Sequence, residues 1–355
     1  MKIFKTSILS LALFASTITF AQETEVATEE PTEEAAPTFS VSGSVDTYFR
    51  SAEFAPNTSF AGIPGFALGM ANIVLSYEGE KHGFVADLVY GPRGTEAVFN
   101  SVGSSNIVNQ LYAYYNVSDS FTLTLGNFNT FLGYEVISPV ANFNYSTSYM
   151  FSYGPFSHTG IKADFALSDD VSLMVAVLNQ TDYTEGNFDS DPDSDGAMFE
   201  KYMYGVQLGL YGQYINLLAG EDYTQIDFTG GLDITDSFFL GVNATSTDLG
   251  GDAGFSGIAL YPQVALSESF SVGLRGEIFS ETDGGVGALY SGSLDGSTED
   301  ADNTSITITG SYTSGNFILK PEFRIDTASA NIYSKNATDF SDNLASFVVA
   351  AIYSF

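Results

Sequence analysis

The sequence contains no cysteine and no tryptophan, and basic residues are scarce. Without cysteine the chain has neither a lipoprotein anchor nor a disulfide-bonded scaffold. Eleven lysine and arginine residues stand against 43 aspartate and glutamate residues, which gives a formal net charge of −32 at pH 7. Such an acidic chain is a poor partner for nucleic acid or anionic lipid headgroups, so cations are its natural partners.

Long hydrophobic runs are also missing. No segment after residue 21 reaches the roughly twenty apolar residues of a transmembrane helix. In lipid, only helices and closed β-barrels satisfy all of their backbone hydrogen bonds. If this protein sits in a membrane, it must therefore cross as β-strands.

The N-terminus has the features of an exported protein. In residues 1–21, two lysines precede a short apolar run and a plausible cleavage site after Ala21, which predicts a secretory signal peptide; an uncleaved signal anchor is the alternative. Residues 22–37 contain six glutamates and little apolar surface. We expect a disordered acidic tail there, because so little apolar surface cannot offset the entropy lost on ordering.

From residue 38 to residue 355 the chain shows one alternating segment after another, separated by polar and glycine-rich clusters. Alternation with a period of two is typical of strands with one apolar and one polar face. About sixteen strands are expected. They are 39–50, 68–78, 84–90, 107–117, 121–129, 157–167, 171–180, 202–211, 214–221, 224–234, 237–246, 256–266, 270–280, 304–312, 316–327 and 343–355.

The connections between these strands alternate between tight turns and long loops, with one short exception at 222–223. This alternation predicts an all-β fold, a transmembrane up-and-down antiparallel β-barrel with both chain ends on the short-turn side. A soluble β-propeller is the main alternative. It would show a recurring blade motif, and the sequence has none.

The charges decide which face of the strands is outside. In Leu319 to Asp326, the charged residues all share one face, and the same separation occurs in other strands. A charge facing lipid near the midplane costs about 2–4 kcal/mol, and a barrel of about sixteen strands leaves an aqueous channel. The charged face is therefore expected to point into water inside the barrel. The predicted pore-lining residues are Asp46, Arg50, Lys162, Asp164, Arg275, Glu277, Lys320, Glu322, Arg324 and Asp326.

These inward charges have two interpretations. They form a transverse electric field that biases which ions pass, or they pair with one another and only make the inner wall hydrophilic. Pro262 and Pro321 strain the strand assignment, because proline cannot donate to the hydrogen-bond ladder of a sheet without edges. A local bulge is one way to relieve this strain.

The longest connection, within residues 126–160, is aromatic and nearly uncharged. It either folds inward and narrows the lumen or caps the mouth of the barrel. Its sequence "LGYEVISPVANFNYSTSYMFSYGPFSHTGIKADF" resembles the signature of the OmpL-like β-barrel porin family of Gram-negative outer membranes. The resemblance implies an outer-membrane pore, and it brings no catalytic residues and no defined substrate.

An acidic loop is the one candidate metal site. Asp189, Asp191, Asp193 and Asp195 alternate and are followed by glycine, as at the start of an EF-hand loop. The twelfth position counted from Asp191 is Tyr202 in place of glutamate. A Ca²⁺ site and a solvated acidic loop both remain open, and no other cofactor is expected.

Enzymatic activity is not expected. His82 and His158 are the only histidines, and no nucleophile motif, phosphate-binding loop or zinc spacing occurs. The leading hypothesis is an outer-membrane porin for small hydrophilic solutes or ions, with a mild cation preference. The alternative is a surface binding or adhesion protein anchored by the barrel. Outer-membrane lipid and the assembly machinery, through the terminal Phe355, are the expected partners, and the sequence leaves oligomerisation open.

Overall fold

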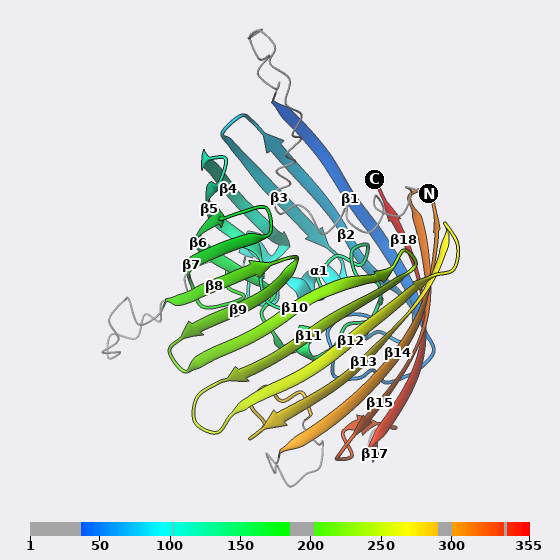
Figure 1. Ribbon diagram of the computed structural model, residues 1–355. Coiled ribbons are helices and arrows are strands. Elements are labelled where there is room, and N and C mark those ends of the chain that lie inside the picture. Colours follow the sequence, from blue (N-terminus) through cyan, green and yellow to red (C-terminus); the bar gives the residue numbers. More distant parts are fainter. Residues whose placement is uncertain (1–36, 102, 185–201, 290–299, 337–338) are drawn as a thin grey trace.

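The computed structural model describes residues 37–101, 103–184, 202–289, 300–336 and 339–355. Sixteen antiparallel strands form a closed barrel (Figure 1), which confirms the predicted fold. The barrel strands are β1 (Thr38–Arg50), β2 (Gly65–Glu78), β3 (His82–Tyr90), β4 (Val108–Ser118), β5 (Phe121–Asn129), β6 (Ser157–Ala166), β7 (Val171–Leu178), β8 (Met203–Leu210), β9 (Gln213–Gly220), β10 (Tyr223–Thr235), β11 (Phe238–Asp248), β12 (Gly254–Ala265), β13 (Phe270–Thr282), β14 (Ala301–Ser314), β15 (Phe317–Ala328) and β18 (Asn343–Ser354). The predicted signal peptide, almost all of the acidic tail and the aspartates of the predicted metal loop lie outside the described residues.

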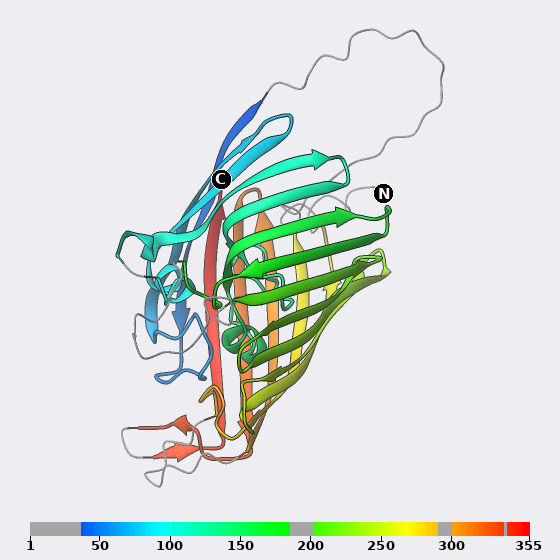
Figure 2. The same ribbon diagram turned by 90° about the vertical axis from the view of Figure 1, so that its left-hand side faces the viewer.

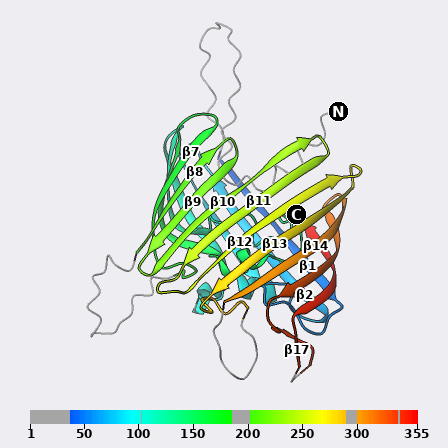
Figure 3. The same cartoon turned by 60° about the horizontal axis from the view of Figure 1, so that its bottom comes forward.

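The barrel closes where the last strand pairs with the first (Figure 3). Ser44 lies opposite Ser354, and the backbones of Gly43 and Phe355 exchange two hydrogen bonds of 3.0 Å. An even number of strands places the start of β1 and the end of β18 at the same rim. This rim carries the short turns, as the spacing of the sequence predicts.

The two faces of the strands differ as the alternation predicts. In β15 the side chains of Phe323 and Ile325 are each 43% exposed on the outer face, while Arg324 and Asp326 between them are 2% and 1% exposed. The outer face is apolar along the other strands as well. Such a surface is suited to lipid, because a charged side chain at an outward position would face the acyl chains and destabilise the barrel.

Neither proline is accommodated by a bulge. Pro321 pairs with Val349 on one side, and on the other side two bridging pairs of the β14 ladder are missing around it. The register is the same before and after the gap. Pro262 interrupts the ladder between β12 and β13 in the same way. Each missing N–H therefore costs local pairing and leaves the strand alignment intact.

The long connections contain short elements that the alternation did not reveal. They are α1 (Pro92–Ala97), α2 (Tyr149–Tyr153), a 3₁₀ turn at Gly103–Ile107, and the paired strands β16 (Tyr333–Ser334) and β17 (Phe340–Ser341). None of the helices in the described part of the chain is long and apolar enough to cross a membrane.

The buried apolar side chains form four clusters, and each of them includes residues from long connections together with residues of the barrel wall. Figure 2 shows the chain between β5 and β6, with the short helix α2, lying within the ring of strands. The interior of this barrel is therefore built largely from its own long connections. This arrangement brings the candidate site together.

Candidate functional site in the barrel lumen

The lumen contains residues 130–156, here called the inserted segment, which leaves β5 and returns to β6. Its first part lies against an apolar patch of the inner wall. Leu132 joins a cluster with Leu178 and Leu218, both of which are fully buried, and Phe131 packs against it. The inner face of β7 to β9 carries apolar side chains at this place. They are compatible with the barrel interior because the inserted segment, and not water, covers them.

The segment next crosses to the wall formed by β10 and β12. The backbone N–H of Gly133 donates to a carboxylate oxygen of Asp227 at 3.0 Å. The ring of Tyr134 stacks on that of Tyr261, with centroids 4.2 Å apart. Polar and aromatic contacts therefore fix the segment on this side as well.

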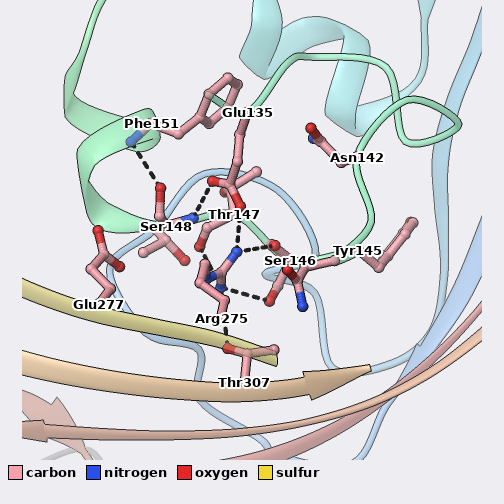
Figure 4. A network of polar contacts seen from close by, with 12 residues as sticks. Glu135, Asn142, Tyr145, Ser146, Thr147, Ser148, Phe151, Arg275, Glu277 and Thr307 are labelled. Atoms are coloured by element: carbon pink, nitrogen blue, oxygen red, sulfur yellow. Dashed lines mark hydrogen bonds and ion pairs between the residues drawn. The ribbon is translucent and has the colours of Figure 1, made fainter. Parts of the chain in front are cut away.

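Arg275 of β13 is the centre of a polar network that holds the middle of the segment (Figure 4). Its guanidinium pairs with Glu135 of the segment at 2.6 Å. It also donates to the carbonyl oxygens of Ser146 and Thr147 at 2.6 and 3.2 Å. Arg275 is fully buried and Glu135 is 5% exposed, so their opposite charges compensate each other away from bulk water.

Two further carboxylates of the wall bind the segment through its backbone. Glu277 accepts hydrogen bonds from the N–H groups of Tyr149 and Met150 at 3.0 and 2.9 Å. Glu322 accepts from the N–H groups of Tyr145 and Ser146 at 2.8 and 3.1 Å. Each carboxylate thus accepts two successive backbone N–H groups, Glu277 at the start of α2 and Glu322 just before it. These are charge-assisted hydrogen bonds.

The basic residues of β15 complete these anchors. Arg324 pairs with Asp326 at 2.7 Å and donates to the carbonyl oxygen of Thr147 at 2.7 Å. Lys320 donates to the carbonyl oxygens of Pro139 and Asn142. The predicted contact of these charges with open water is replaced by contact with the inserted segment.

The first strand carries two more of the predicted residues. Asp46 accepts the hydroxyl of Tyr145 at 2.5 Å, and Arg50 donates to the carbonyl oxygens of Phe54 and Ala61. Asp46 and Arg50 are 7% and 3% exposed. Eight of the ten predicted pore-lining residues are therefore buried.

Lys162 and Asp164 of β6 are different. They pair at 2.8 Å, and their side chains are 25% and 37% exposed. They are the two predicted residues that keep contact with solvent.

The end of the inserted segment is bound by Asp182, which follows β7. One carboxylate oxygen of Asp182 accepts the N–H groups of Phe156 and Ser157 at 2.6 and 3.0 Å. Burial raises the pKa of Asp182 to about 6, although these hydrogen bonds act in the opposite direction.

Several residues that hold the inserted segment lie in the connections, where no strand alternation predicts them. Arg93 of α1 lies 4.2 Å from the ring centroid of Phe60 and donates to the carbonyl oxygen of Ile137 at 2.9 Å. Glu135, Asp182 and Arg93 follow no alternation. The signal in the sequence that could have identified Arg93 is the scarcity of basic residues, because an arginine in a connection is then unusual.

The histidines do not form a catalytic arrangement. His158 is fully buried among aromatic rings, and its Nε2 lies 3.0 Å from the hydroxyl of Thr130. His82 starts β3 on the opposite rim. Within the described ranges, no group of three or more histidine, aspartate or glutamate side chains is arranged to hold a metal ion.

Comparison with known proteins gives a family. The family model described as "Putative beta-barrel porin-2, OmpL-like" matches residues 38–355. The chain belongs to this porin family. The porin acts in the outer membrane of a Gram-negative bacterium, as the sequence predicted. A comparison with curated proteins gives no match.

Solved structures show the same barrel at low sequence identity. The outer membrane channel DcaP of Acinetobacter baumannii has a TM-score of 0.58 and 13% identity, covering 91% of this porin and 99% of that chain. An anion-selective porin from Comamonas acidovorans has a TM-score of 0.57 and 11% identity, covering 90% and 100%. A loop L8 deletion mutant of OmpT from Vibrio cholerae has a TM-score of 0.56 and 12% identity, covering 90% and 100%.

Proposed function

We propose that this porin is a non-enzymatic pore for passive diffusion of small hydrophilic solutes and ions, with a modest preference for cations. The observation that carries the proposal is the inserted segment, which is held inside a closed barrel by buried charge. A segment fixed in the lumen narrows the passage and leaves the barrel as its wall. Such a constriction limits the size of the solutes that pass.

The cation preference follows from where the charges lie. Five basic residues, Arg50, Arg93, Arg275, Lys320 and Arg324, are at most 3% exposed. Their charge is compensated by contacts with connections and carboxylates. Exposed acids remain at both rims, such as Asp119 and Asp236 at the short turns and Asp252 on the long loops. Solvated charge of one sign attracts ions of the opposite sign into the mouths of the pore.

One structural relative is described as anion-selective, and that description applies to the Comamonas protein. At 11% identity the two proteins share the barrel fold, and charge placement has to be compared residue by residue. In this porin most of the exposed charge is acidic, which supports a preference for cations.

Planar-bilayer recording tests the proposal. We expect stepwise single-channel conductance, and in a potassium chloride gradient a reversal potential with the sign of cation preference. Anion preference would contradict the proposed selectivity. Absence of any conductance from correctly folded protein would instead favour a surface binding protein for which the barrel is only an anchor.

A further inference from the structure

The inner wall of the barrel is covered unevenly. On β13 to β15 the central inward side chains are almost fully buried: Arg275, Thr307 and Glu322 are at most 1% exposed. On β4 to β6 the central inward positions include two side chains that solvent partly reaches, Tyr112 and Lys162, while Thr124 beside Lys162 is 4% exposed. Solvent inside the barrel therefore meets the wall formed by β4 to β6.

The course of the inserted segment explains this asymmetry. Its polar part is bound to Glu277 and Glu322, and thus to β13 and β15. Its first part lies on the apolar patch of β7 to β9 through Leu132. These anchors hold the segment toward the far wall, and β4 to β6 are the strands left beside its base.

Lys162 is the charge that this wall presents. Among the residues that the structure describes, it is the one basic side chain on the inner wall that is not buried. Its Nζ lies 2.8 Å from Asp164 and 5.5 Å from the ring centroid of Phe128. An ion passing here meets both members of a partly hydrated pair, whereas the guanidinium of Arg275 is shielded behind the segment.

We infer that ions and small polar solutes pass along the wall of β4 to β6, and that Lys162 and Asp164 are the residues that set charge selectivity there. The buried charges of β13 and β15 position the inserted segment and do not touch the permeating ion. This inference rests on the proposed function. It separates the ten predicted pore-lining charges into eight that are buried and two that select ions.

Charge removal tests the role of the pair. We expect Lys162→Gln to raise the ratio of cation to anion permeability about two- to threefold, which is the scale of one solvated charge at roughly 6 Å from an ion. Asp164→Asn should lower that ratio. Lys81→Gln, which removes an exposed lysine from the turn between β2 and β3, is the matched control and should leave the ratio near the wild-type value. Unchanged selectivity in both pair variants would overturn the inference.

Thiol labelling tests the path itself. Because the chain has no cysteine, each introduced thiol is unique. We expect a charged methanethiosulfonate reagent to reduce the conductance of Thr122→Cys and to leave that of Thr307→Cys unchanged. The two variants make the same small substitution on opposite walls, with Thr122 near the short-turn rim and Thr307 in the middle of β14. If the reagent reduces the conductance of Thr307→Cys and not that of Thr122→Cys, the path follows the opposite wall and the inference is wrong.

The two levels of failure are distinguishable. If the wild-type porin conducts but neither pair variant shifts the reversal potential, the path inference fails and the porin function stands. If folded wild-type protein never conducts, the proposed function fails, and this inference fails with it.

Discussion

In this barrel, single buried carboxylates accept hydrogen bonds from backbone N–H groups that have no neighbouring strand to pair with. Glu277 and Glu322 each accept two N–H groups from a segment that has no sheet partner. An N–H left unpaired in a buried site costs about 1–3 kcal/mol. Breaking a buried ion pair such as Arg275 with Glu135 costs about 3–5 kcal/mol, since the remaining charge has no partner.

Asp182 makes the stability of the porin depend on pH. Its pKa is about 6 in the folded protein, above the ordinary aspartate value of 3.8, so the folded state binds the proton more tightly than the unfolded state. The free energy of unfolding should therefore fall as the pH rises from about 4 to about 6. Allowing for solvent screening, we expect a change of about 1–2 kcal/mol.

The Asp182→Asn variant isolates this effect, because it keeps an acceptor oxygen and removes the titration. Urea unfolding in detergent, followed by circular dichroism between pH 4 and pH 7, should show a smaller loss of stability in this variant than in wild type. Asp119→Asn, at an exposed turn, is the control. Equal pH profiles for wild type and Asp182→Asn would refute the assignment.

At the scale of elements, the inserted segment combines an apolar contact at its start with charged anchors in its middle. Leu132 lies in the apolar cluster, and the backbone from Tyr145 to Met150 is held by carboxylates. Because both parts are fixed, we expect the segment to act as a rigid constriction of the lumen.

Loosening the anchors should change the current. In the double variant Glu277→Gln with Glu322→Gln, the charge-assisted hydrogen bonds are weakened. We expect a larger and noisier single-channel conductance than in wild type. Glu268→Gln, which changes an exposed short turn, should leave the recording as in wild type.

Deleting residues 136–150 is the stronger form of the same test. The deletion removes most of the constriction, and single-channel conductance should rise. An unchanged conductance in a folded deletion variant would show that the segment does not limit the passage of ions.

At the scale of the whole molecule, the outer surface of the closed barrel is apolar, and the interior holds long connections together with the charged side chains of the inner wall. Outward side chains such as Ile306, which is 52% exposed, and Leu125, which is 65% exposed, have no protein partner over much of their area. Continuous apolar surface of this extent is stable in lipid and associates in water.

The folded porin should therefore require detergent or lipid to stay dispersed. Size-exclusion chromatography should show a defined species in detergent and aggregates after detergent removal. Circular dichroism gives the control that the dispersed species is β-structured. A folded, monodisperse protein in plain buffer would contradict the membrane assignment.

The sequence alone predicted much of this molecule. The alternation in Leu319 to Asp326 specifies which side chains point inward, because the period of a strand is a local property. The spacing of the turns predicted the order of the strands. The scarcity of basic residues indicated that the rims of the barrel are acidic. How the strands accommodate Pro262 and Pro321 was left open by the sequence, and the structure shows that the ladder loses pairs locally without changing its register.

Alternation and turn spacing are enough to specify the barrel, its two faces and the rim at which its ends meet. What the inward charges touch depends on the folded barrel. Lys320 reaches Pro139 across 181 positions of the chain, and Arg275 reaches Glu135 across 140. Such pairs form only once the barrel has closed around the inserted segment, so no local pattern encodes them.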